Sequence, residues 1–159
     1  MTPDRIKFAK ANYRQELPWV RIEDFKHLVL PRPIALVNGA FDLLHSGHMK
    51  ILFCARNHAK SVVCAMDSDE KLRANKLGRP ILSWIERATA LGFMPIDYLT
   101  EINNDEEFRL LVKLLKPDLR VQGAEYKDTI SRVRTPKLLV HNSGMRTSEI
   151  VRRIKNGSN

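Results

Sequence analysis

The chain has 159 residues, 43% of them hydrophobic, which is typical of one globular domain with a core of two or three layers. A formal net charge of +9, from 27 Lys and Arg against 18 Asp and Glu, favours anionic partners such as nucleic acid, a membrane surface or phosphorylated small molecules. No apolar stretch suits a signal peptide or a membrane span, so we expect a cytoplasmic protein without a membrane partner. The basic residues are scattered rather than clustered in a tail, which disfavours nucleic acid as the partner.

Residues 1–33 form an N-terminal extension in this interpretation, because they contain four prolines and only weak periodicity. Residues 21–28 are compatible with a short helix packed on the body, but we expect an irregular surface arm. Residues 34–159 are then the functional domain.

Short apolar segments bounded by turn residues alternate with helical patterns after residue 33, which predicts an α/β fold with a doubly wound parallel sheet of five strands and helices on both faces. The expected strands are Ile34 to Asn38, Ser61 to Met66, Asp97 to Thr100, Leu119 to Gln122 and Lys137 to His141. The expected helices are Gly47 to Ala59, Ser83 to Phe93 with a capping box from Ser83 to Glu86, Asn104 to Leu115, and Thr147 to Lys155.

Two cysteines, Cys54 and Cys64, lie in apolar surroundings and lack the CxxC spacing of a zinc site or a redox dithiol. We expect buried thiols in a reducing compartment.

The turn after the first of the five strands reads Asn38-Gly39-Ala40-Phe41-Asp42-Leu43-Leu44-His45-Ser46-Gly47-His48. In open α/β sheets, ligands bind outside the carboxyl ends of the strands, where the winding reverses. Gly39 allows the backbone to approach a ligand, and Gly47 leaves N–H groups at a helix start free to face an anion. The glycine spacing fits neither a P-loop nor a GxGxxG turn, yet the segment predicts a phosphate site.

Two histidines distinguish this turn from other phosphate loops. His45 and His48 are three residues apart at the helix start, so both rings can point toward one phosphoryl group and stabilise its growing charge. Asp42 is either a magnesium ligand or a local backbone hydrogen-bond partner, and we assign it no metal role.

The segment GAFDLLHSGH resembles the GxFDxxHxGH signature of the cytidylyltransferase-like family, which includes glycerol-3-phosphate cytidylyltransferases, phosphopantetheine adenylyltransferases and the adenylyltransferase domain of ADP-heptose synthase. The stretch from Leu77-Gly78-Arg79-Pro80 to Arg87 and the segment Val121-Gln122-Gly123-Ala124-Glu125-Tyr126 are similar to the heptose branch. Gly144-Met145-Arg146-Thr147-Ser148-Glu149-Ile150 stands where the family carries GxSTTxI. The resemblance covers residues 34–156.

The resemblance implies a role for each matching residue. The catalytic residues would be His45 and His48. The residues that bind the nucleotide would be Gly39, Ala40, Phe41, Gly123, Arg146, Thr147 and Ser148. The residues that bind the acceptor would be Lys76, Arg87, Gln122 and His141.

This chain departs from the family pattern at three positions. Asn75 stands where both branches tend to carry a lysine, although Lys76 follows it. Gln122 replaces a lysine, and Arg146 replaces the first serine of STT, which keeps an anion site electrostatically favourable.

The function that the resemblance implies is transfer of a nucleoside monophosphate, with AMP favoured, from a nucleoside triphosphate to a phosphate monoester such as a sugar 1-phosphate, with Mg²⁺ as cofactor and release of pyrophosphate. An alternative is a cytidylyltransferase acting on glycerol 3-phosphate or another phospho-alcohol. An alternative of another class is a non-catalytic module that binds nucleotides or nucleic acid. A homodimer and a monomer both stay open.

Overall fold

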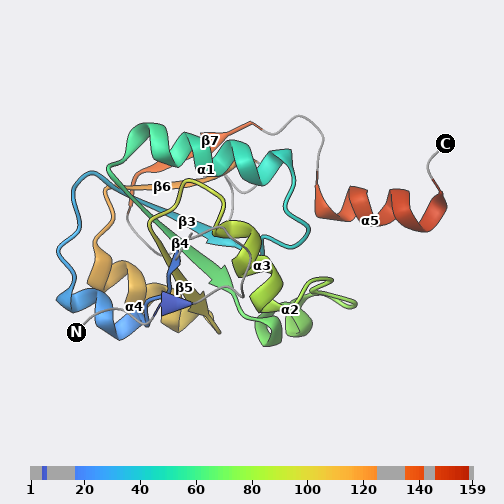
Figure 1. The fold of residues 1–159 in the computed structure, drawn as a ribbon, viewed down its shortest axis with the longest axis horizontal. Helices are drawn as coiled ribbons and strands as arrows, with labels where there is room; N and C mark the ends of the chain where they lie inside the picture. The colour runs from blue at the N-terminus through green and yellow to red at the C-terminus, as the bar shows by residue number, and fades with distance from the viewer. Residues whose placement is uncertain (1–4, 7–16, 125–134, 142–145, 158–159) are drawn as a thin grey trace.

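The computed structural model describes residues 5–6, 17–124, 135–141 and 146–157. Its centre is a five-stranded parallel sheet with the strand order β5-β4-β3-β6-β7, drawn in Figure 1. The strands are β3 (Ile34–Gly39), β4 (Ser61–Asp67), β5 (Tyr98–Ile102), β6 (Leu119–Gly123) and β7 (Lys137–Val140). The chain winds outward from β3 to β5, returns to β6 beside β3, and winds outward again to β7. The predicted doubly wound sheet is therefore confirmed.

Helices cover both faces of the sheet, because its buried strands present apolar side chains on both sides. One face packs against α1 (Ser46–His58) and α3 (Trp84–Leu91), with Leu52 and Leu91 fully buried between the layers. The other face packs against α4 (Asp105–Leu115) and a 3₁₀ helix, η1 (Ile22–His27).

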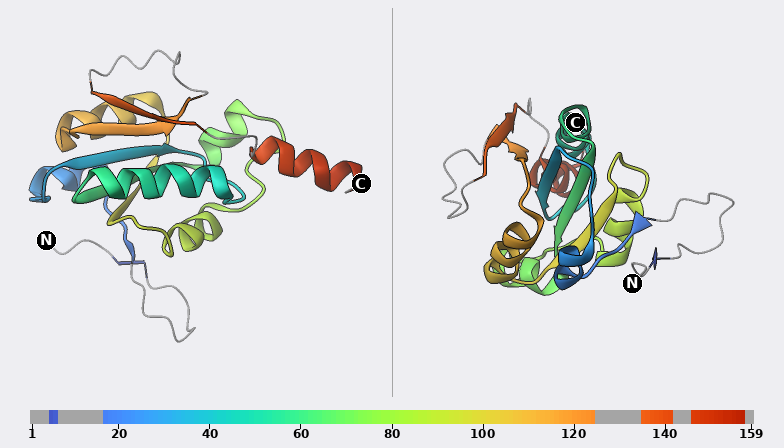
Figure 2. Two further views of the ribbon diagram at one scale, coloured as in Figure 1. Left: turned by 90° about the horizontal axis from the view of Figure 1, so that it is seen from above. Right: turned by 90° about the vertical axis from the view of Figure 1, so that its left-hand side faces the viewer.

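The predicted helices are confirmed to within two residues at each end. α3 begins with the expected capping box, in which the Glu86 carboxylate accepts the Ser83 backbone N–H at 2.8 Å. α4 is capped by Asn104, whose side chain accepts the N–H groups of Glu106 and Glu107. α5 (Thr147–Asn156) projects away from the sheet and buries none of its residues (Figures 1 and 2).

One helix, α2 (Asp69–Asn75), has no counterpart among the sequence predictions. It follows β4 directly and is capped by Ser68, whose hydroxyl accepts the Lys71 N–H at 3.1 Å. It buries only Leu72, so its sequence carries too little apolar periodicity to be recognised.

The segment before β3 is part of the core rather than a surface arm, so that expectation is wrong for residues 19–33. Its backbone joins the edge of the sheet, where the Val20 N–H donates to the Leu99 carbonyl at 2.9 Å. Val20, Ile22 and Phe25 are then buried with residues of α4. Two short antiparallel strands, β1 (Arg5–Ile6) and β2 (Leu17–Pro18), precede it.

Both cysteines are free thiols. Cys64 is fully buried on β4, and burial raises the pKa of its thiol, whereas Cys54 is only partly buried. In the part of the chain that the structure describes, every helix is too short or too polar to cross a bilayer.

Candidate active site

The candidate site lies in the turn between β3 and α1, at the point where the winding of the sheet reverses. β3 pairs with β4 on one side and with β6 on the other, so the turn leaves the sheet at the crevice between the two halves. Gly39, Ala40 and Phe41 form its first part, and Phe41 is buried against the α1 face of the core. Gly123 ends the neighbouring strand β6 and is also buried.

His45 caps the start of α1 with its own side chain. Its Nδ1 atom accepts the Gly47 backbone N–H at 3.1 Å, so Nδ1 carries no proton in this geometry. The neutral ring then holds its proton on Nε2, at the far side of the imidazole. The helix start, which attracts anions through its partial positive charge, thus also presents the N–H donor of the His45 ring.

His48 stacks on His45, with ring centroids 3.9 Å apart and ring planes at 28°. The structure therefore brings the two rings of the motif together, as their spacing predicts. The His48 ring also contacts Phe41, with ring centroids 5.3 Å apart, and its Nδ1 atom is buried with no hydrogen-bond partner among the described residues.

The protonation state of His48 follows from this enclosure. Burial disfavours the imidazolium and the neighbouring His45 adds to the effect, whereas Asp42 opposes it, so the pKa of His48 falls to about 4. His48 is therefore neutral at pH 7. A neutral imidazole has one nitrogen that donates and one that accepts a hydrogen bond. Such a ring can bind a phosphate oxygen through its N–H group and does not repel a nearby metal ion.

The first turn of α5 lies beside the histidine pair. The Thr147 hydroxyl donates to the Asp42 carbonyl at 2.9 Å, and its oxygen lies 3.4 Å from His45 Nε2. Because the hydroxyl proton is directed at Asp42, the oxygen is positioned to accept from the His45 ring. Two motifs about a hundred residues apart in the chain therefore meet here, and the starts of α1 and α5 lie together.

Arg146 and Ser148 of this second motif are exposed at the same helix end. Arg146 occupies the N-cap position of α5 and makes no side-chain cap bond there, and Ser148 follows Thr147 on the surface. A cation at a helix start opposes the helix dipole unless an anion is near. Gly144 and Met145 lie outside the described residues.

Asp42 is a buried structural anchor and not a free ligand. Its side chain accepts from the Arg79 guanidinium at 2.8 Å and from the backbone N–H groups of Ile81 at 2.9 Å and Leu82 at 3.0 Å. Burial works against its ionisation, but these three donors outweigh it and the pKa of Asp42 lies below the ordinary value. Both carboxylate oxygens are therefore engaged by the segment 79–82.

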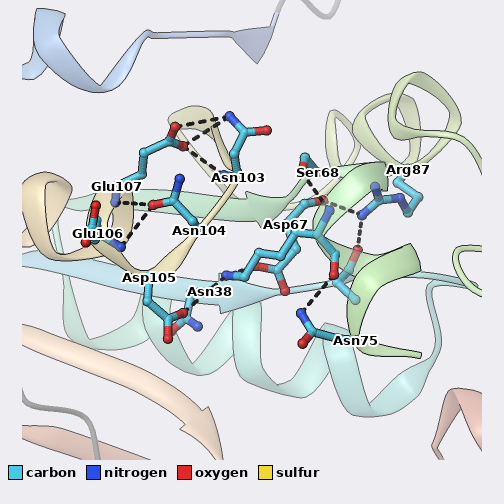
Figure 3. Close-up of polar contacts among 12 residues, drawn as sticks. Asn38, Asp67, Ser68, Asn75, Arg87, Asn103, Asn104, Asp105, Glu106 and Glu107 are labelled. Carbon is cyan, nitrogen blue, oxygen red and sulfur yellow. Dashed lines mark hydrogen bonds and ion pairs between the residues drawn. The ribbon is translucent and has the colours of Figure 1, made fainter.

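Arg87 differs from the expected substrate contact, because its side chain is fully buried. Its guanidinium donates to the carbonyl of Asp67 at 3.0 Å (Figure 3). It also donates to the carbonyl of Ala40 and to the Asp69 carboxylate, the latter at 2.7 Å. A guanidinium with these partners connects the turn between β3 and α1 to the end of β4 and the start of α2. In this structure Arg87 positions the turn.

The other expected acceptor residues lie on different elements from the histidine pair. Lys76 is exposed at the end of α2, and His141 is exposed just after β7. Gln122 is buried on β6, and strand alternation turns it to the α4 face, opposite the neighbouring Val121. Their contact with an acceptor stays a prediction. Glu125 and Tyr126 of the heptose-like segment lie outside the described residues.

The model of the cytidylyltransferase-like family matches residues 36–154. Among curated proteins, the bifunctional protein HldE of Psychromonas ingrahamii is 33% identical over 99% of this chain, and that of Helicobacter pylori is 35% identical over 79%. This chain spans 37% and 28% of the lengths of those two relatives, respectively.

Solved structures with low sequence identity share the fold. A lipopolysaccharide core biosynthesis protein from Thermoplasma volcanium superimposes with a TM-score of 0.57 at 20% identity, covering 69% of this chain and 97% of that one. Pantoate-β-alanine ligase from Francisella tularensis gives a TM-score of 0.56 at 13% identity, covering 80% and 67% of the two chains.

Proposed function

The chain belongs to the cytidylyltransferase-like family of nucleotidyltransferases, and we propose that it transfers AMP from ATP to a sugar 1-phosphate and releases pyrophosphate. The observation that carries this proposal is the stacked pair His45 and His48 joined to the first turn of α5 through Thr147. The likeness to the heptose branch in the segment 77–87 supports the choice of ATP and of a sugar phosphate.

The triphosphate would bind where the two helix starts meet. Each helix start carries a partial positive charge, and together the two starts make a site for an extended polyanion. The Ser148 hydroxyl and the Arg146 side chain add donors on the α5 side. The overall charge of +9 attracts the same anions from a distance.

The reaction needs positioning and charge stabilisation more than a strong base. A phosphate monoester has its second pKa near 6, so at pH 7 it is mostly a dianion and already nucleophilic. One of its oxygens attacks the α-phosphorus in line, a new P–O bond forms, and the bond to pyrophosphate breaks with its electron pair leaving on the pyrophosphate oxygen. His45, which donates from Nε2, and neutral His48 would hydrogen-bond the charged oxygens as this exchange occurs.

Mg²⁺ would be bound mainly through the nucleotide. Within the described residues no group of three His, Cys, Asp or Glu side chains forms a metal site, and both Asp42 oxygens already accept protein donors. Mg²⁺ is commonly held by substrate phosphates and water with few protein ligands, which suits this arrangement. When bound, the ion would neutralise charge on the triphosphate. The two free thiols are in keeping with a reducing cytoplasm, the location that we propose.

A substrate panel tests the proposal. Pyrophosphate release is measured with each of the four nucleoside triphosphates and Mg²⁺, against sugar 1-phosphates and against phospho-alcohols that include glycerol 3-phosphate. We expect turnover with ATP and a sugar 1-phosphate. Turnover with CTP and glycerol 3-phosphate would overturn the substrate assignment but keep the reaction, and no release with any pair would overturn the reaction itself.

A further inference from the structure

Asp42 is bonded to two parts of the site at once. Its carboxylate holds the segment 79–82 through the Arg79 side chain and two backbone N–H groups. Its backbone carbonyl accepts the hydroxyl of Thr147, which itself lies against His45. Asp42 is only 2% exposed, so these hydrogen bonds form in a water-poor environment, where they are strong.

The backbone conformation around Asp42 leaves its carbonyl and its carboxylate little freedom to move independently of each other. Phe41 and Leu43, the residues on either side, have φ angles of 52° and 50°, in the left-handed region that residues with a Cβ atom seldom adopt. Such conformations persist when surrounding contacts fix them. Here the Arg87 guanidinium holds the Ala40 carbonyl just before the strained pair. A shift of the Asp42 carbonyl therefore moves its carboxylate as well.

We propose that Asp42 is a positioning residue that couples occupation of the triphosphate site at His45 and Thr147 to the order of the segment 79–82. The proposal rests on the proposed function for the identity of the ligand at Thr147. Nucleotide binding would fix the Thr147 hydroxyl and hence the Asp42 carbonyl, and through the carboxylate it would hold Arg79, Ile81 and Leu82. Because coupling is reciprocal, an ordered segment 79–82 would in turn favour the nucleotide.

Amide hydrogen exchange measures this coupling without any acceptor. The full chain is labelled with and without a non-hydrolysable ATP analogue and Mg²⁺, and exchange is followed at the Ile81 and Leu82 amides, which donate to Asp42. We expect saturating nucleotide to slow exchange at both amides by at least about 5-fold in the wild type, the lower end of typical coupling between sites. In Asp42→Asn this slowing should disappear at the amide that faces the side-chain NH₂ group, because that group cannot accept a hydrogen bond and only one acceptor oxygen remains.

Asp97→Asn is the matched control. The Asp97 carboxylate also accepts hydrogen bonds from a backbone N–H group, that of Val62 at 2.7 Å, and from a guanidinium, that of Arg56 at 2.6 Å. Asp97 precedes β5, however, and so lies at the opposite end of the sheet. Its loss should lower the melting temperature and leave the nucleotide-dependent slowing at Ile81 and Leu82 intact. If both variants keep the slowing, or if both lose it, the coupling does not pass specifically through Asp42 and the proposal is overturned.

A second variant covers the case in which Asp42→Asn does not fold. Thr147→Val keeps the shape of the side chain but removes the hydroxyl that donates to Asp42. At nucleotide concentrations that saturate this variant, slowing at Ile81 and Leu82 should still be lost, and its retention would overturn the proposal. Wild-type protein that binds the analogue by calorimetry without any slowing overturns this inference alone, whereas wild-type protein that binds no nucleotide overturns the proposed function on which it rests.

Discussion

Acidification should destabilise the protein through His48 more than through an ordinary histidine. In the unfolded chain this ring takes up its proton near pH 6.5, but in the fold its pKa is about 4, because it is buried and stacked on His45. Between these values the unfolded state binds more protons, so the free energy of unfolding falls as the pH is lowered. The gap between 6.5 and about 4, at about 1.4 kcal/mol for each pH unit, makes the loss on the order of 3 kcal/mol.

Urea unfolding at about pH 7 and at about pH 4.5 measures this loss. Wild type should lose roughly 2 to 3 kcal/mol more over that interval than His48→Asn, whose side chain does not titrate. His27→Asn, which removes an exposed histidine from η1, is the control and should follow the wild type. This comparison cancels the contribution of the carboxylates that all three proteins share.

Equal loss of stability in wild type and His48→Asn would refute the reasoning, because the ring would then titrate alike in both states. A direct reading comes from the NMR titration of the His48 ring, which should have its midpoint near 4 and should move upward when an ATP analogue binds. The upward movement follows because triphosphate charge stabilises the imidazolium form. A midpoint near 6.5 in the free protein would show that the ring is not enclosed.

Three further variants test separate parts of the site. His45→Ala should lower kcat by at least about 10²-fold in pyrophosphate release, with a smaller change in nucleotide affinity, and near-normal turnover would remove His45 from the chemistry. Lys76→Ala should raise the KM for the acceptor and leave the KM for the nucleotide almost unchanged; the opposite pattern would assign this lysine to the triphosphate. Arg146→Ser should weaken triphosphate binding in calorimetry by about 1 to 2 kcal/mol and slightly raise the melting temperature of the free protein, and unaltered affinity would mean that Arg146 faces solvent only.

The fold could be predicted because its strands and helices carry local signals. The central strands are continuous apolar runs, and α3 begins at the capping box expected from Ser83 and Glu86. The segment 19–33 was harder to interpret, because its prolines and weak periodicity suggest an irregular arm. What orders it is a long-range contact, the pairing of Val20 with the edge strand β5, which no local pattern contains.

The candidate site also has features that the sequence predicts and features that depend on long-range contacts. The spacing of His45 and His48 predicts that their rings converge, and the topology of a doubly wound sheet predicts where they lie. The structural roles of Asp42 and Arg87 could not be predicted, because their hydrogen-bond partners are far away in the sequence. The Asp42 carboxylate accepts from Arg79, and the Arg87 guanidinium donates to the Ala40 carbonyl. Arginine near a phosphate motif suggests a substrate contact, and only the packing shows that Arg87 is buried with carbonyl and carboxylate partners.

The fate of the acceptor's phosphate oxygens tests the central claim most directly. The productive acceptor is prepared with ¹⁸O in its terminal phosphate oxygens and incubated with unlabelled ATP and Mg²⁺, and both products are analysed by mass spectrometry. Attack of an acceptor oxygen on the α-phosphorus predicts a nucleoside diphosphate sugar that keeps all the label, with none in pyrophosphate. Label in pyrophosphate, or its partial loss from the sugar product, would contradict transfer of the nucleoside monophosphate to the acceptor phosphate.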